Sequence, residues 1–285
     1  MERKENIDDL IDIYRNEDNF IIESFPSNKR NICCVFFSSL GIYAHNDVMG
    51  LKTVHDVDKY EWKSLCKSNL ISKYYKKIIF IRDIKKIFYL EGISKKIDSI
   101  NKLGLFLSKE TKGMDVYLVG SSAGGYAAYI LSNYLKNVKR IYSIGGVVDL
   151  KEHSTYLEYK ENIQSTSATE IIQTINNNSL VLHFCGSKNQ ESINGIGIIQ
   201  TVVSKNKLTI IPLKSTEHAP RPSGKDLIKL LTCSDKHLKR IKRKMRSKTE
   251  VGYFQFSIIN LGIIKATINR IKKSIIRIIK NEKKF

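Results

Sequence analysis

The sequence has few cysteines, and their spacing does not suggest a metal site. Five occur among 285 residues, an odd number, and none recur at the intervals of metal ligands. Cys33, Cys34 and Cys185 lie in apolar runs typical of strands, where a free cysteine behaves as a small core residue. We therefore expect a protein of a reducing compartment, the cytoplasm.

Long apolar segments are also missing. The N-terminus, residues 1–6, is charged and leads into no apolar stretch of the kind a signal peptide needs. No run approaches the length of a membrane span. The sequence also lacks a glycine-rich phosphate loop, a dinucleotide-binding fingerprint and a His/Cys cluster, so we expect no metal cofactor.

The positive charge is concentrated at one end. The formal net charge is +20, and residues 236–285 hold 16 Lys and Arg against two acids, Glu250 and Glu282. The remaining 235 residues carry 32 Lys and Arg against 26 acids. We therefore divide the chain into a catalytic domain, residues 1–235, and a basic tail, residues 236–285.

Segments typical of strands and of helices alternate along the first domain. Apolar runs predict strands at 19–24, 32–37, 77–82, 116–119, 138–144, 180–185 and 208–212. Helical spacing of apolar residues predicts helices at 93–107, 126–131, 193–203 and 226–231. This order predicts the α/β class, with a mainly parallel sheet covered by helices on both faces.

Three connections have their own signals. The turn Pro26-Ser27-Asn28 between the first two strands predicts a hairpin. Residues 38–60 show no clear periodicity and are interpreted as a loop. Residues 146–178 are polar in their middle, and we interpret them as a cap inserted between two strands.

A serine motif stands where a strand meets a helix. The apolar run 116–119 leads into Gly120-Ser121-Ser122-Ala123-Gly124, which fits Gly-x-Ser-x-Gly, and a helical segment follows. This order is typical of the nucleophile elbow of the α/β-hydrolase fold, in which the central serine occupies a tight, strained turn. Ser122 is therefore the candidate nucleophile, and a glycine-rich turn without chemistry is the alternative.

A serine hydroxyl needs a base and an acid to orient that base. In this fold the base follows the last strand, and His218 is the histidine that stands there. Glu191 is the carboxylate in the loop after the penultimate strand, and we prefer it as the acid. Asp149, one strand earlier, is the alternative acid.

Further groups are expected around the nucleophile. The oxyanion hole should combine the N–H of Ala123 with an N–H from Ser39 or Ser38, after an early strand. Arg82 and Asp83 follow another strand, at the sheet edge where ligands bind. They are candidate substrate ligands, for a phosphate or a carboxylate in the case of Arg82, with a plain structural ion pair as the alternative.

Three segments together resemble proteins encoded with bacterial surface-polysaccharide genes. They are Phe80-Ile81-Arg82-Asp83, Phe88-Tyr89-x-x-Gly92-Ile93 and the elbow at 119–126. Some of these α/β-hydrolase-fold proteins are capsular O-acetyltransferases, and the resemblance covers residues 15–235. It implies acetyl transfer from acetyl-CoA to a sugar hydroxyl, with Ser122 as the acetylated nucleophile and His218 as the base. A carboxylesterase or deacetylase with the same residues and a non-catalytic assembly factor are the alternatives.

The tail combines charge with an apolar stripe. Residues 236–248 form a dense cationic run, and Ile264, Ile268, Ile271, Ile275 and Ile278 then recur at intervals of four and three. Such a basic amphipathic helix can lie in the headgroup region of an anionic membrane, here the inner face of the cell membrane. Alternatively, the stripe packs on a partner or on the domain, or the cationic run binds an acidic polysaccharide. Nucleic acid is a weaker candidate partner, because charge alone supports it.

Overall fold

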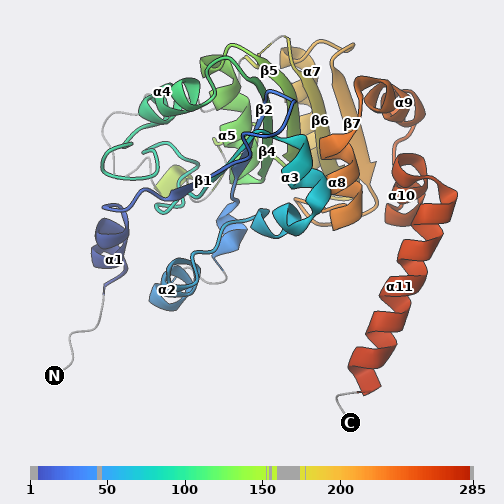
Figure 1. Ribbon diagram of the computed structural model, residues 1–285, viewed down its shortest axis with the longest axis horizontal. Helices are drawn as coiled ribbons and strands as arrows, with labels where there is room; N and C mark the ends of the chain where they lie inside the picture. Colours follow the sequence, from blue (N-terminus) through green and yellow to red (C-terminus); the bar gives the residue numbers. More distant parts are fainter. Residues whose placement is uncertain are drawn as a thin grey trace.

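The computed structural model describes residues 6–43, 47–151, 153, 156–158, 174–176 and 178–282, with the main chain alone for 277–282. Its central element is a sheet of seven strands in the order β1-β3-β2-β4-β5-β6-β7 (Figure 1). The strands are β1 (Phe20–Ser24), β2 (Ile32–Phe37), β3 (Lys77–Ile81), β4 (Asp115–Ser121), β5 (Val138–Ile144), β6 (Leu180–Gly186) and β7 (Leu208–Leu213). β1 is antiparallel to β3, and the other neighbouring strands are parallel.

The predicted hairpin between the first two strands is wrong. β1 pairs with β3, whereas β2 lies between β3 and β4. Burial explains the difference: all six residues of β2 are buried, while β1 has no fully buried residue. A strand that is apolar on both faces belongs inside a parallel sheet, and a half-exposed strand suits an edge.

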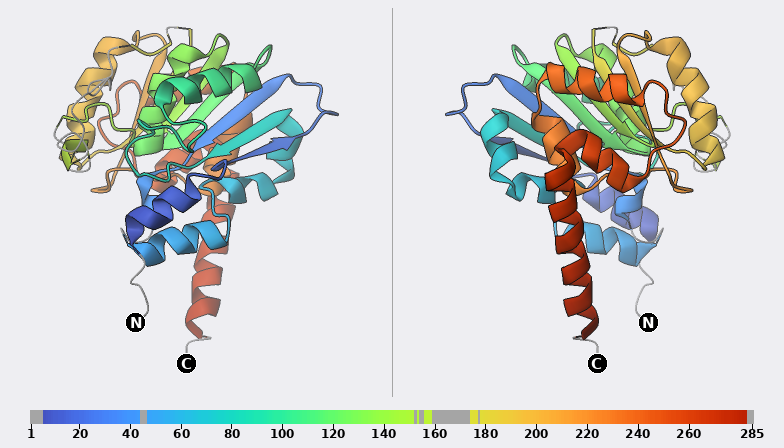
Figure 2. Two further views of the ribbon diagram at one scale, coloured as in Figure 1. Left: turned by 90° about the vertical axis from the view of Figure 1, so that its left-hand side faces the viewer. Right: turned by 90° about the vertical axis from the view of Figure 1, so that its right-hand side faces the viewer.

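Helices cover both faces of the sheet, as predicted (Figure 2). Alternate residues of β2 divide between the two cores, with Val35 facing one and Phe36 the other. The first core includes α4 (Ile100–Glu110), α5 (Ala123–Leu131) and α7 (Gln190–Val202). The second includes α3 (Asn69–Tyr74), α8 (Gly224–Thr232), α9 (Asp235–Met245) and α10 (Tyr253–Leu261).

A third, smaller core lies beside the sheet. It joins α1 (Ile7–Tyr14) to α2 (Val48–Asp56), through Leu10, Leu51 and Val54 among others. The interpretation of 38–60 as a loop missed α2, whose first turn is capped by the Asp47 side chain accepting from the Gly50 N–H. Short 3-10 helices occur at η1 (Leu40–Ile42), η2 (Lys63–Lys67) and η3 (Ser132–Tyr134).

Capping residues moved two helix boundaries from their predicted places. The helix expected from residue 93 begins at Ile100, because Ser99 caps it and the preceding turn contains Gly92 with a φ of +66°. The helix expected from residue 193 begins at Gln190, where the Asn189 side chain accepts from the Ser192 N–H. The cap predicted at 146–178 lies largely outside the described residues.

The C-terminal segment forms three helices. Leu238, Ile241 and Met245 of α9 and Phe256 of α10 are buried in the second core, and the boundary predicted at residue 235 coincides with the start of α9. The third helix, α11 (Ile263–Glu282), extends away from the sheet (Figures 1 and 2). Among the described helices, none is long and apolar enough to cross a membrane.

We predict that Gly120→Ala destabilises the fold by at least about 3 kcal/mol. A Cβ at Gly120 would lie 2.0 Å from the Gly124 carbonyl oxygen, which is main chain and cannot turn away. Urea unfolding measures the change. The control is Gly197→Ala on α7, where a Cβ meets nothing within 4 Å and should stabilise the helix by about 0.5–1 kcal/mol. Equal stabilities of the two variants would contradict the packing described above.

Candidate active site

Ser122 occupies a strained turn between β4 and α5. Its φ is 50° and its ψ is −118°, a conformation that costs a non-glycine residue about 1–3 kcal/mol. The side chain is partly exposed, while its neighbours Ser121 and Ala123 are completely buried. Strand, strained serine and helix follow each other as in a nucleophile elbow, so the sheet and this turn together form an α/β-hydrolase-like fold.

The turn after β5 connects Ser122 to His218. The Ser122 N–H donates to the Ile144 carbonyl at 3.0 Å, and the Val147 N–H donates to the Ser122 carbonyl at 3.4 Å. Between them, Gly145 has a φ of +56°, and a Cβ there would lie 2.3 Å from the His218 carbonyl oxygen. A glycine is required at this point, and it brings the loop after β7 against the elbow.

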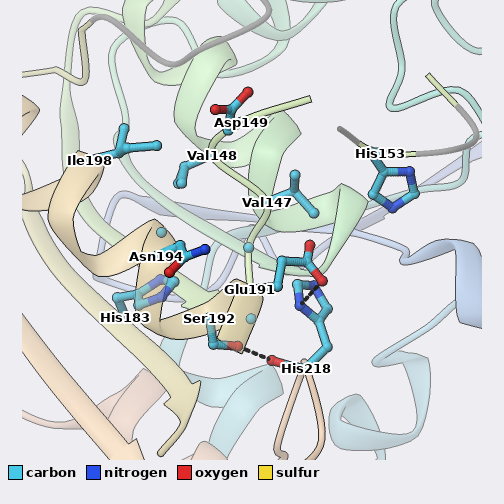
Figure 3. Close-up of a pocket in the computed structure, with 13 residues that line it drawn as sticks. Val147, Val148, Asp149, His153, His183, Glu191, Ser192, Asn194, Ile198 and His218 are labelled. Atoms are coloured by element: carbon cyan, nitrogen blue, oxygen red, sulfur yellow. Dashed lines mark hydrogen bonds and ion pairs between the residues drawn. The ribbon is translucent and has the colours of Figure 1, made fainter. Parts of the chain in front are cut away.

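His218 and Glu191 face each other, as Figure 3 shows. The His218 Nδ1 lies 3.2 Å from a Glu191 carboxylate oxygen, an ion-pair distance at which the ring N–H is not aligned for a hydrogen bond. The nearby imidazole lowers the pKa of Glu191 below its ordinary value, against the opposing effect of burial. The first turn of α7 also suits a carboxylate, because the positive end of the helix dipole lies there.

The other ring nitrogen of His218 is free to act. Nε2 is buried and has no hydrogen-bond partner among the described residues, so the structure shows no bond from it to Ser122 Oγ. Catalytic hydrogen bonds are often long before substrate binds. The arrangement therefore brings a carboxylate to His218 without a formed contact between His218 and Ser122.

A cavity of about 640 Å³ adjoins this pair. Its lining comes from the turn after β5, the first turns of α7 and three histidines, and the residues are Gly145, Gly146, Val147, Val148, Asp149, His153, His183, Glu191, Ser192, Asn194, Gly195, Ile198 and His218. In the view of Figure 3, His183 and His153 lie on opposite sides of the Glu191–His218 pair. Such a volume and mixture of groups suit a small ligand.

Asp149 lines the cavity but points to another partner. Its carboxylate accepts from the Lys151 N–H at 2.9 Å, a turn-type contact, and no ion pair joins it to His218 in the described structure. Of the two candidate acids, the structure therefore brings Glu191 to the base.

Two cavity histidines were not anticipated as site residues. His183 is buried, as expected of a core histidine, and its Nδ1 lies 2.9 Å from the Tyr129 hydroxyl. Burial lowers the pKa of His183 to about 3, which keeps the ring neutral. Burial also lowers the pKa of His153, whose ring meets Phe88 edge-on. No pattern in the sequence predicted that these two histidines line one cavity with Glu191.

The predicted oxyanion donors differ in whether their N–H groups already have an acceptor. Ala123 begins α5, so its N–H has no acceptor within the helix. The Ser38 N–H instead donates to the Ile81 carbonyl at 2.9 Å, as an extension of the sheet. The Ser39 N–H donates to the Glu61 carboxylate at 2.5 Å.

The Glu61 side chain is fixed beside the loop of Ser38 and Ser39 by contacts of its own. Its side chain is 7% exposed and forms an ion pair with Arg221, whose guanidinium lies over the Trp62 ring. A Cβ at Gly124 would lie 2.4 Å from the Phe37 carbonyl oxygen, so the loop abuts the first turn of α5. The Ser39 N–H can therefore act as a second oxyanion donor only when the Glu61 carboxylate leaves it.

Arg82 and Asp83 are buried away from the cavity lining. The Arg82 guanidinium contacts Asn19, Val54, Asp58 and the Tyr60 ring. Asp83 accepts from the N–H groups of Lys86 and Tyr89, and burial raises its pKa to about 6. These contacts give both side chains structural roles, and substrate binding by them stays a prediction. In the described part of the chain, no three His, Cys, Asp or Glu side chains form a metal site.

We predict that His183 makes folding stability fall in mild acid. Its ordinary pKa of about 6.5 applies to the unfolded chain, so the unfolded state takes up a proton first. The contribution of neutral His183 to the free energy of unfolding is complete above about pH 6.5. It is lost as the pH falls toward 3, by up to about 1.4 kcal/mol per pH unit. Urea unfolding of His183→Gln should show a shallower pH slope than the wild type. Tyr129→Phe, which keeps the buried imidazole, is the control and should retain the slope; identical slopes for the wild type and His183→Gln would refute the prediction.

Comparison with known proteins gives no family. No family model and no curated protein matches the sequence. A lipase-esterase related protein from Clostridium acetobutylicum is 13% identical, with a TM-score of 0.40 and coverage of 80% of this chain and 99% of that chain. An α/β serine hydrolase without a lid from Xanthomonas campestris is 11% identical, with a TM-score of 0.39 and coverage of 80% and 90%. A chain of a glycosylation-associated protein complex from Streptococcus agalactiae is 15% identical, with a TM-score of 0.40 and coverage of 68% and 39%. These scores are low, so the fold assignment stands on the sheet and on the turn at Ser122.

Proposed function

We propose that this chain is a serine-dependent O-acetyltransferase that moves an acetyl group from acetyl-CoA to a sugar hydroxyl of a bacterial surface polysaccharide. The observation that carries the proposal is the strained backbone of Ser122, which the turn after β5 links to the loop that holds the His218–Glu191 pair. A serine in a costly conformation and an imidazole paired with a carboxylate are the parts that an activated nucleophile needs.

The reaction has two steps that share one histidine. His218 takes the Ser122 proton as Oγ bonds to the thioester carbonyl carbon, the carbon–sulfur bond breaks, and the thiol leaves with that proton. A sugar hydroxyl then attacks acetyl-Ser122 and gives its proton to His218, which returns it to Oγ as the ester bond to Ser122 breaks. Glu191 holds the ring and stabilises its positive form.

The oxyanion needs donors where its charge develops. The Ala123 N–H at the start of α5 is one, and the Ser39 N–H becomes the second once the Glu61 carboxylate moves off it. Arg221 already pairs with Glu61 and offers the carboxylate a partner away from the oxyanion. Binding of the acyl donor would therefore be coupled to a shift of Glu61.

The cavity supports a polar acceptor. His153 and Asn194 line it with side chains able to bond to hydroxyl groups, and Val148 and Ile198 add apolar surface. The resemblance to surface-polysaccharide proteins supplies the class of sugar polymer. An esterase is the second candidate, because the Glu191 side chain is 55% exposed to solvent.

Acetyl-CoA should leave an acetyl group on Ser122, which intact-mass measurement detects. Ser122→Ala should abolish the adduct and reduce transfer by about 10³-fold or more. Ser121→Ala is the matched control, because Ser121 is completely buried one residue away and should leave the adduct intact. An adduct that persists in Ser122→Ala would remove this serine from the mechanism. No adduct with acetyl-CoA or a fluorophosphonate would favour a non-catalytic assembly factor, and release to water in the presence of capsule oligosaccharide would favour the esterase.

Glu191→Gln should lower the turnover number by about 10²–10⁴-fold, because the amide no longer stabilises the imidazolium. Asp149→Asn is its matched control and should stay within about threefold of the wild type, since Asp149 makes no contact with His218 in the described structure. Steady-state kinetics with both variants compare the two acids. A large loss in Asp149→Asn with near-normal Glu191→Gln would reverse the assignment.

A further inference from the structure

The last helix leaves the body of the protein after a single glycine. α11 has 20 residues and begins after Gly262, whose φ is +89°. Its first two turns are braced: Ala266 is buried, Asn269 bonds to Lys225, and the Arg270 guanidinium lies 4.8 Å from the Phe254 ring centroid. Beyond these contacts the helix projects away from the sheet (Figures 1 and 2).

An apolar stripe on this helix faces solvent. Ile264, Ile268, Ile271 and Ile275 lie on one face and are 73%, 46%, 53% and 49% exposed. The corresponding apolar faces of α9 and α10 are buried in the second core. Exposed isoleucines at helical spacing are costly in water, so they indicate a surface that another phase or molecule covers.

The charge of α11 indicates which kind of molecule covers this stripe. Residues 263–282 contain six Lys and Arg and a single acid, Glu282. Lys265 and Lys272 flank the stripe, and Arg270 and Lys273 lie behind it. In a second copy of α11 these flanking positions would again be lysine, with no acid opposite to pair with them. A self-paired helix is therefore repelled, whereas an anionic surface is attracted.

We propose that α11 lies in the headgroup region of an anionic lipid bilayer. The isoleucine stripe enters the acyl boundary, and the flanking lysines reach the lipid phosphates with their long stems. Each basic residue near an anionic surface contributes about 1 kcal/mol, so charge and stripe act together. This inference does not depend on the chemistry at Ser122.

The test is co-sedimentation of the full chain with vesicles of phosphatidylcholine, with and without phosphatidylglycerol. The wild type should bind the phosphatidylglycerol vesicles, bind pure phosphatidylcholine at least about tenfold more weakly, and lose binding in high salt. The triple variants Ile268→Ser/Ile271→Ser/Ile275→Ser and Lys265→Gln/Lys272→Gln/Lys273→Gln should each bind at least about tenfold more weakly.

The matched control is Met49→Ser/Leu70→Ser/Leu105→Ser, whose apolar side chains are 66%, 63% and 68% exposed outside α11 and should not matter for binding. Thermal unfolding verifies that each variant is folded, which the exposure of the changed residues predicts. Wild-type levels of binding in the isoleucine variant, or no binding by the wild type, would overturn the proposal. A further result would also overturn it: the wild type is a dimer that binds no vesicles, and the isoleucine variant is a monomer. A second copy of the chain would then cover the stripe.

Discussion

The Ser122 carbonyl accepts three main-chain hydrogen bonds, from the N–H groups of Gly125, Tyr126 and Val147. Two of these donors begin α5, and the third belongs to the turn after β5 that also presses against His218. This one carbonyl group therefore positions α5 and the end of β5. Through Gly145, it also positions the loop that contains His218. The strain at Ser122 persists because partners on each side hold it in place.

Burial selects which groups can react around this peptide. The pKa of Cys33 and that of Cys185 are raised to about 12, so neither thiol competes as a nucleophile. His183 is kept neutral by the same effect, and its uncharged ring leaves Glu191 as the charged partner of His218. Glu61 is a second carboxylate near the site. It accepts a hydrogen bond from the Ser39 N–H, the proposed oxyanion donor, and forms an ion pair with Arg221. In the proposed mechanism, the carboxylate of Glu191 assists the base, and that of Glu61 has to move away from Ser39.

Local sequence signals predicted the parts of the site that lie next to strand ends. Gly120 and Gly124 mark the elbow, and the order of His218 and Glu191 along the chain follows from the α/β-hydrolase-like sheet. Long-range choices were not predictable in the same way. The pairing of β1 with β3 depends on relative burial, and the approach of His153 and His183 to one cavity depends on how the segment after β5 packs against β6. Glu61 was missed because 23 residues and a helix separate it from the loop at Ser38.

Gly262 joins α11 to α10 through one residue whose φ is +89°. A helix of 20 residues is about 30 Å long, so a small rotation at this joint sweeps the far end through a large arc. If lipid fixes the helix, the same rotation instead tips the sheet relative to the bilayer. The two dihedral angles of a single glycine then set the height and direction at which the cavity beside His218 faces the bilayer.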